Sequence, residues 1–179
     1  MLPSRFTRND WLDLGITLLK QYGADALVVE NLCESAGKTR GSFYFHFQNI
    51  EDYLSALAEL WLNEFTTKIT ARGETPPPGR TDLLNQLAAR LDLDLESGIR
   101  QLAMRNTNVA EIVTSADQSR VAWLSRLYGN CGEYNDNQAA ALARIEYAAF
   151  TGFSLIDPDL SPAGARSLYE HFLELTNRR

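Results

Sequence analysis

The stretch VVENLCESAGKTRGSFYFHF, residues Val28 to Phe47, decides the fold predicted for the first part of this chain. Its first half repeats apolar residues at the spacing of one buried helical face, namely Val29, Leu32, Cys33 and Ala36. Gly37 is expected to end this helix, because glycine readily adopts the left-handed conformation of a sharp helix end. Thr39 can then cap a second, short helix that ends near Phe47. The stretch therefore predicts a helix-turn-helix.

The second helix of this motif divides into an apolar face and a polar face. Phe43 and Phe47 are four residues apart and are expected to anchor one face in a core. The other positions hold side chains that hydrogen-bond and suit DNA: Arg40 for guanine, Ser42 for a base or a phosphate, and Tyr44 and His46 for phosphates. Gly41 leaves room for a close approach. An ordinary amphipathic helix explains the same spacing equally well, so the pattern leaves both interpretations open.

The longer segment AGKTRGSFYFHFQNIEDYL resembles the recognition segment of the TetR family of bacterial transcriptional regulators. The resemblance covers residues 1 to about 60, and beyond them only the order and length of the helices match. The matching features are Ala36-Gly37, Thr39, Gly41-Ser42, Phe43-Tyr44, His46-Phe47 and the acidic helix start at Glu51-Asp52.

Three residues depart from the family pattern. Val28 stands where the family usually has a capping Thr or Ser, and Lys38 replaces a customary apolar residue in the turn. Ile50 replaces a lysine that commonly contacts phosphate, so the resemblance carries no DNA contact over to this position. The candidate DNA-binding residues are then Lys38, Thr39, Arg40, Gly41, Ser42, Tyr44 and His46.

The remaining sequence predicts helices throughout, and therefore an all-α fold of about nine helices. A three-helix head is expected over residues 1–48, and a helical ligand-binding and dimerisation body over 49–179, as the resemblance implies. The expected helices outside the motif cover about 7–22, 50–72 (capped by Asn49), 81–95, 97–106, 109–128, 137–156 and a last helix opened by Ser161-Pro162. Residues 73–80, rich in proline, read as a connector, and 129–132 as a turn.

Composition and charge exclude several classes of protein. The 179 residues contain no run of eighteen apolar residues and no secretory signal at the start, which predicts a cytoplasmic protein without a membrane span. Two cysteines are too few for a disulfide scaffold or a zinc site. The net charge of −6 arises after Phe47, because acidic and basic residues are equal in number before it. Within the head, a basic edge is expected from Arg5, Arg8, Lys38 and Arg40.

Catalytic, metal and cofactor sites are not expected. The chain has no glycine-rich phosphate loop and neither of the hydrolase motifs HExxH and GxSxG. Cys131 and His171 form a conceivable thiol–imidazole pair, but nothing in the sequence places them together.

Two sets of residues in the body are candidates for assembly and ligand binding. Small residues on the penultimate helix allow another helix to approach closely. The resemblance implies that this helix and the stripe of the last helix form a two-fold interface at Ala148, Gly152, Leu168 and Phe172, and an internal core is the alternative. Large side chains at Trp61, Met104, Trp123 and Tyr128 predict a pocket for a small apolar or aromatic effector, with plain core packing as the alternative.

The sequence therefore predicts a DNA-binding transcriptional regulator. As the resemblance implies, it is expected to repress as a homodimer on a palindromic double-stranded operator, and to be released by a small effector. The alternative is a helical ligand-binding or protein-interaction module whose head no longer binds DNA, which the departures at Val28 and Ile50 allow.

Overall fold

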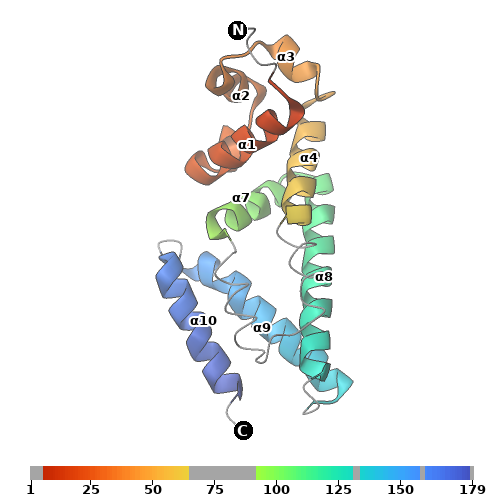
Figure 1. The fold of residues 1–179 in the computed structure, drawn as a ribbon, viewed down its shortest axis with the longest axis vertical. Coiled ribbons are helices and arrows are strands. Elements are labelled where there is room, and N and C mark those ends of the chain that lie inside the picture. The colour runs from red at the N-terminus through yellow and green to blue at the C-terminus, as the bar shows by residue number, and fades with distance from the viewer. Residues whose placement is uncertain (1–5, 65–91, 131–133, 158–159, 178–179) are drawn as a thin grey trace. The chain divides into compact units, whose positions relative to one another are not determined.

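The computed structural model describes residues 6–64, 92–130, 134–157 and 160–177, and most of these residues lie in helices (Figure 1). No strand occurs within these ranges, and the predicted all-α fold class is confirmed. The described α-helices are α1 (Arg8–Tyr22), α2 (Val29–Ala36), α3 (Arg40–Tyr44), α4 (Ile50–Leu62), α7 (Leu93–Ala103), α8 (Thr107–Asn130), α9 (Asp136–Ile156) and α10 (Pro162–Asn177). A 3-10 helix, Ala24–Ala26, precedes α2. None of the described helices is both long and apolar enough to cross a membrane.

The chain divides into two compact units. The first consists of Met1–Asn63 and Asp94–Thr114, and the second of Glu64–Leu93 and Ser115–Arg179. The first unit therefore contains α4, nearly all of α7 and the start of α8 in addition to the three helices predicted for the head. The functional division predicted at residue 48 stays a prediction.

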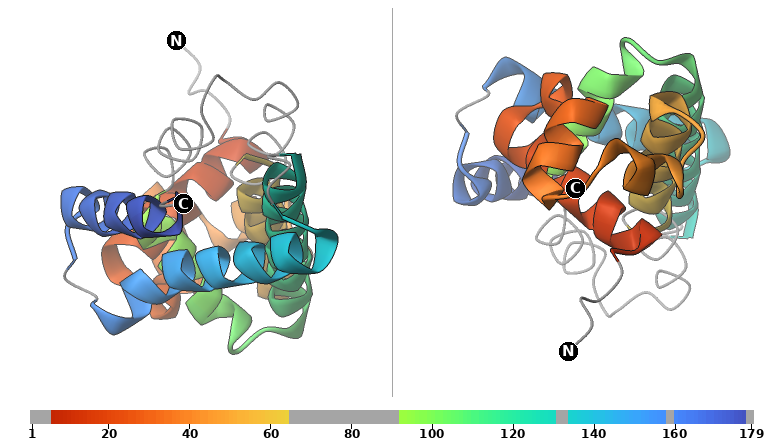
Figure 2. Two further views of the ribbon diagram at one scale, coloured as in Figure 1. Left: turned by 90° about the horizontal axis from the view of Figure 1, so that it is seen from below. Right: turned by 90° about the horizontal axis from the view of Figure 1, so that it is seen from above.

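An aromatic core holds the first unit together. Trp11, Phe43 and Tyr53 are fully buried, and the Phe43 ring lies 5.4 Å from both the Trp11 and the Tyr53 rings. Phe47 completes the cluster at 4.9 Å from Tyr53. Each pair adds about 0.5–1.5 kcal/mol beyond the area that it buries. This core joins α1, α3 and α4, and the right panel of Figure 2 shows these helices from above.

Glycine allows α1 and α4 to pack closely. Tyr53 of α4 donates a hydrogen bond of 2.9 Å from its hydroxyl to the backbone carbonyl of Trp11. A Cβ at Gly15 would lie 1.9 Å from that hydroxyl oxygen, so only glycine leaves space for the ring. Burial raises the pKa of the Tyr53 phenol, which keeps it a hydrogen-bond donor.

The residues predicted to end and cap the helices of the helix-turn-helix do so in the structure. Gly37 ends α2 in the left-handed conformation, with φ 61° and ψ 36°. The Thr39 side chain accepts a hydrogen bond from the Ser42 backbone N–H and so caps α3. Val28 precedes α2 and provides no side-chain cap, in line with its departure from the family pattern. The helix α3 ends at Tyr44, earlier than the predicted end near Phe47.

The start of α4 confirms the predicted cap, and a second hydrogen bond precedes the helix. Asn49 accepts a hydrogen bond of 2.8 Å from the Asp52 backbone N–H, as expected of the cap. The Asp52 carboxylate accepts a hydrogen bond of 2.9 Å from the backbone N–H of Gln48. The carboxylate still satisfies a backbone donor before the helix, so the start of α4 remains well capped.

Two predicted boundaries in the body were wrong. The helix expected over 97–106 begins at Leu93, because Leu95, Ile99 and Leu102 form one buried face that starts before Ser97. The turn expected over 129–132 begins later, since α8 continues to Asn130. The predicted residues 65–72, 73–80 and 81–91 lie outside the described part of the chain.

The second unit has its own core between α8 and α9. Its buried members are Trp123, Leu124, Leu127, Tyr128, Ala139 and Ala143, and Phe172 of α10 packs against them. The fully buried Glu146 accepts a hydrogen bond of 2.6 Å from the Tyr128 hydroxyl, which stabilises the carboxylate inside this core. Ser161 accepts from the Gly164 backbone N–H and caps α10, as predicted. Figures 1 and 2 show α10 returning beside α9.

Candidate nucleic-acid interface

The short helix α3 buries one face and exposes the other. Phe43 and Phe47 have 0% and 1% of their surface exposed, so they anchor the segment in the aromatic core, as predicted. Arg40, Gly41 and Tyr44 are exposed, whereas Ser42 is half-buried. The Phe45 backbone N–H donates to the Gly41 carbonyl, so these two residues lie one above the other on the exposed face.

Gly41 has no internal reason to be glycine. Its φ is not positive, and a Cβ there would meet only the Thr39 hydroxyl oxygen, at an ordinary 3.7 Å. Glycine inside a helix costs about 0.5–1 kcal/mol relative to alanine. The exposed face of α3 therefore lacks a side chain at Gly41, at some cost in stability. The space left by this glycine suits an external backbone or base that approaches α3 closely.

Arg40 is held at the surface by an acidic partner. One of its guanidinium nitrogens lies 2.5 Å from a carboxylate oxygen of Glu30 on α2, and both side chains are mostly exposed. Exposed ion pairs of this kind contribute about 0–1 kcal/mol, so another acceptor can displace Glu30 at little cost. The pair orients the guanidinium without fixing it.

The N-terminal segment packs against the candidate interface. The His46 ring nitrogen Nε2 donates to the Phe6 carbonyl at 3.0 Å, since a carbonyl oxygen can only accept. The ammonium group of Lys38 lies 5.7 Å from the centre of the Phe6 ring. The guanidinium of Arg8 lies 5.1 Å from the centre of the Phe47 ring. Three basic or imidazole side chains thus lie near α3, and Arg5 of the predicted basic edge falls outside the described residues.

Phe45 is the residue of this face that the sequence analysis missed. It is 66% exposed, the adjacent Tyr44 is 52% exposed, and the His46 ring stands edge-on at 4.9 Å. A helical period of four residues from Phe43 to Phe47 places Phe45 on the outer side, and this signal was available in the sequence. Because Phe45 lies on the opposite side of the helical turn from Phe43 and Phe47, the helical period predicts that it is exposed although both of them are buried.

The predicted interface residues in the body occupy different environments. Ala148 and Leu168 are exposed, and Gly152 is half-buried, with open space where a Cβ would stand. Phe172 is partly buried against the core of its own unit. Exposed Ile145 and Ile156 share the α9 face with Ala148 and Gly152, because these positions follow a helical period.

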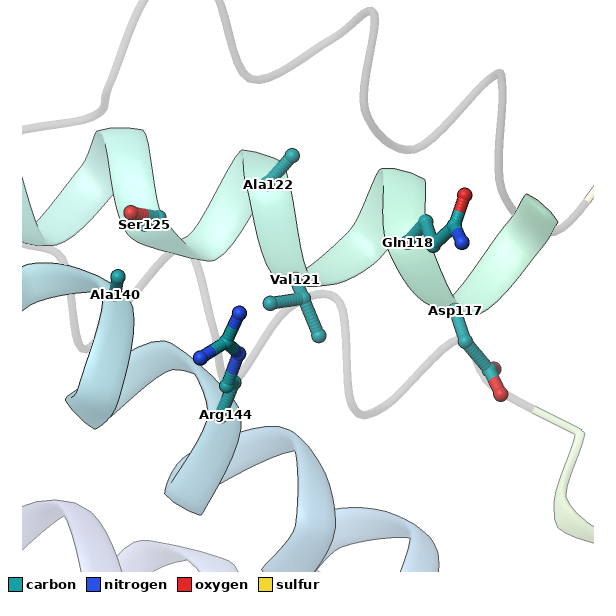
Figure 3. Close-up of a pocket in the computed structure, with 7 residues that line it drawn as sticks. All are labelled: Asp117, Gln118, Val121, Ala122, Ser125, Ala140 and Arg144. Atoms are coloured by element: carbon teal, nitrogen blue, oxygen red, sulfur yellow. The ribbon is translucent and has the colours of Figure 1, made fainter. Parts of the chain in front are cut away.

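The four predicted effector-binding residues divide between the two units. Trp123 and Tyr128 belong to the core of the second unit, whereas Trp61 is buried in the first and Met104 is 85% exposed there. A groove of about 440 Å³ lies instead between α8 and α9, and none of the four lines it. Its lining includes Asp117, Val121, Ala140 and Arg144; Figure 3 shows Val121 and Arg144 pointing into the space between the helices.

The histidine of the conceivable catalytic pair makes a local contact. His171 Nδ1 donates to the Ser167 carbonyl one turn earlier in α10, at 2.7 Å. Cys131 lies outside the described residues, so the pair itself is not described. Cys33 is a buried free thiol, as predicted, and burial raises its pKa.

The geometry of the first unit defines a class of protein: an all-α chain with a capped helix-turn-helix whose second helix exposes Arg40, Gly41 and Tyr44. Residues 12–57 match the family model described as "Bacterial regulatory proteins, tetR family". Over this segment, which holds the helix-turn-helix, the chain is similar to the TetR family.

Known proteins resemble the chain over its head in sequence and over its whole length in fold. The HTH-type transcriptional regulator AcrR of Shigella flexneri is 35% identical over 54 residues, which span 30% of this chain and only 25% of the relative. A TetR transcriptional regulator from Legionella pneumophila has a TM-score of 0.78 at 13% identity, with 99% of this chain and 100% of that chain covered. The reduced form of Escherichia coli NemR has a TM-score of 0.69 at 17% identity, with 92% and 95% covered. The two structural likenesses show the fold.

Proposed function

We propose that this chain is a DNA-binding transcriptional regulator that inserts α3 into the major groove of a palindromic operator and represses transcription as a cytoplasmic homodimer. The observation that carries the proposal is the exposed face of α3, which is bare at Gly41 without an internal reason and flanked by Arg40 and Tyr44. The match of residues 12–57 to the TetR family model and the similarity to AcrR support it.

Each side chain of the face has a role in the proposal. Arg40 leaves Glu30 and makes bidentate bonds to a guanine, the commonest specific contact in the major groove. Thr39, Ser42, Tyr44 and Lys38 contact phosphates or sugars and set the position of the helix. His46 already donates to the Phe6 carbonyl through Nε2, so its role in the proposal is to order the N-terminal segment; a bond to phosphate would require an N–H on Nδ1 as well.

The substitution Gly41→Ala tests this proposal with a clean separation of stability from binding. Within the chain the new methyl group meets only an ordinary contact, and alanine favours helices, so the melting temperature should stay the same or rise. On DNA the same methyl group should prevent the close approach and weaken binding by about tenfold or more, on the order of 1–3 kcal/mol. Binding is measured by mobility shift with duplexes that the wild-type chain selects from random-sequence DNA.

A matched control is Gly129→Ala in α8, where a Cβ would also meet open space. This variant should gain stability and bind the selected duplexes like the wild type. If selection enriches no duplex, the proposed function is wrong. If Gly41→Ala binds like the Gly129→Ala control, DNA does not approach α3 at this position.

The homodimer part of the proposal rests on exposed apolar residues of α9 and α10. Ile145, Ala148 and Ile156 lie exposed on one face of α9, and Leu168 and Leu175 are exposed on α10. Apolar faces of two helices form a four-helix interface when two copies meet about a two-fold axis. Two heads would then read two half-sites about 34–36 Å apart, or a multiple of that distance.

The effector part of the proposal assigns a small, largely apolar or aromatic molecule to the body. The groove between α8 and α9 offers apolar side chains from Val121 and Ala140 and one charge of each sign from Asp117 and Arg144. Linkage gives the test: an effector that releases DNA must lose affinity for the chain by the same factor when operator is bound. A ligand whose affinity is indifferent to operator is not the inducer.

One observation favours a second candidate, a helical module that no longer binds DNA. Ile50 begins α4 where the family commonly has a lysine on phosphate, so the head has one cation fewer near the groove. Under this alternative the selection from random DNA enriches nothing, whereas the dimer persists.

A further inference from the structure

The exposed aromatic ring of Phe45 is large and apolar, yet it lies on the face of α3 that the proposed function turns toward DNA. It has 66% of its surface exposed, whereas Phe43 and Phe47, two residues before and after it, are buried. The Phe45 backbone N–H bonds to the Gly41 carbonyl at 3.1 Å, so the ring stands one turn beyond the bare position.

The ring is supported in this exposed position. The imidazole of His46 stands edge-on to it, with centroids 4.9 Å apart and an interplanar angle of 87°. His46 is itself tied to the Phe6 carbonyl at 3.0 Å. An apolar side chain that is exposed and also held by a neighbour suits contact with a partner.

The chemistry of phenylalanine limits what that contact can be. Its ring has no donor and no acceptor, so it cannot bond a phosphate or the polar edge of a base. The apolar group that the major groove presents is the 5-methyl of thymine. We infer that Phe45 is a specificity-determining residue that selects thymine by packing against this methyl group. The inference rests on the proposed function, because it requires α3 to lie in the groove.

Helix geometry predicts where the thymine lies. Phe45 follows Arg40 by five residues, about 7.5 Å along a helix axis. Base pairs are spaced by about 3.4 Å, so the thymine should lie roughly two base pairs from the guanine that Arg40 reads.

Replacement of thymine by deoxyuridine tests the inference, because it removes the methyl group and leaves every hydrogen-bonding group in place. The probes are duplexes that the full-length wild-type chain selects from random-sequence DNA, with one thymine per half-site replaced at a time. At one position the loss should weaken binding by about fourfold per half-site, which corresponds to about 0.8 kcal/mol for one buried methyl group. All other thymines should tolerate the replacement.

Variants of the chain complete the test. Phe45→Ala should bind the thymine and deoxyuridine duplexes equally, and Phe45→Leu should keep part of the preference. Tyr44→Phe is the matched control, because it removes a hydrogen-bonding group beside Phe45 and should keep the full fourfold preference. Since Phe45 is exposed, none of these changes should alter the far-ultraviolet circular dichroism.

The outcomes separate this inference from the proposed function. If selection enriches duplexes but no thymine is sensitive, the chain binds DNA and Phe45 does not read a methyl group. If Phe45→Ala keeps the preference, another residue reads it. If Phe45→Ala weakens all duplexes alike, Phe45 contacts the sugar–phosphate backbone. If no duplex is enriched, the proposed function fails and the inference fails with it.

Discussion

Substitution of Gly15 by alanine tests the packing that supports the head. The Cβ of alanine would lie 1.9 Å from the Tyr53 hydroxyl oxygen and 3.0 Å from the ring carbon that carries it. Tyr53 must therefore move, and its hydrogen bond to the Trp11 carbonyl must lengthen or break. Gly15→Ala is thus expected to destabilise the first unit although alanine is the better helix former.

The magnitude follows from three terms. Overpacking of this kind costs about 1–3 kcal/mol. Loss of the hydrogen bond adds about 0.5–1.5 kcal/mol, and the helix preference of alanine returns about 0.5–1 kcal/mol. We expect Gly15→Ala to lower the free energy of unfolding by about 2–3 kcal/mol. Tyr53→Phe removes the oxygen that would clash. In a protein that already carries Tyr53→Phe, Gly15→Ala should therefore lower the free energy of unfolding by about 1 kcal/mol or less.

Urea denaturation of the four proteins in this cycle measures the coupling. All four carry Trp123→Phe, so that Trp11 and Trp61 are the only tryptophans and both report on the first unit. This matters because two compact units need not unfold together. If Gly15→Ala costs as much in the Tyr53→Phe protein as it does with Tyr53 intact, the reasoning is refuted, since the clash would then not involve the hydroxyl group.

Three further predictions concern DNA, assembly and pH. Arg40→Ala should cost about 1–3 kcal/mol of operator binding and relax selectivity at one base pair per half-site, whereas Arg126→Ala, which removes a charge from α8, should preserve selectivity in the same mobility-shift assay. Ala148→Arg should yield monomers in sedimentation velocity, because it puts a charge on the apolar face of α9, and Ser119→Arg on an exposed part of α8 should not. Backbone and side-chain hydrogen bonds from the N-cap of α1 lower the pKa of Asp10 from its ordinary value of 3.8. Its stabilising contribution is therefore present above that value and is lost as the pH falls through the folded-state pKa. Asp10→Asn should melt at a lower temperature at neutral pH, with the difference closing below pH 3.8; a constant difference would contradict it.

The helix-turn-helix could be predicted because its signals are local. Gly37 and Thr39 act within three or four residues of themselves, and the period of four from Phe43 to Phe47 is visible in the sequence. The start of α7 was less accessible, since Leu93 and Leu95 fit equally well at the end of a preceding helix. Periodicity cannot decide between two helices that share an apolar run.

Features that depend on contacts between distant residues could not be predicted. The ion pair of Arg40 with Glu30 joins two helices, and the bond of His46 to Phe6 spans 40 positions. The sequence gives no sign that Gly15 must be glycine, because this requirement comes from the Tyr53 side chain, which packs directly against it from α4. The sequence predicted which side chains of α3 contact DNA, whereas the structure showed which of them are already engaged within the chain.

The central claim is that the exposed face of α3 binds a specific DNA sequence. A mobility-shift titration of the full-length chain against the region upstream of its own gene tests it most directly, with an unrelated duplex of equal length as competitor. Specific binding should exceed non-specific binding by about 10³-fold or more, with two chains on each duplex. Equal affinity for both duplexes, for a chain that circular dichroism shows to be folded, would contradict the claim.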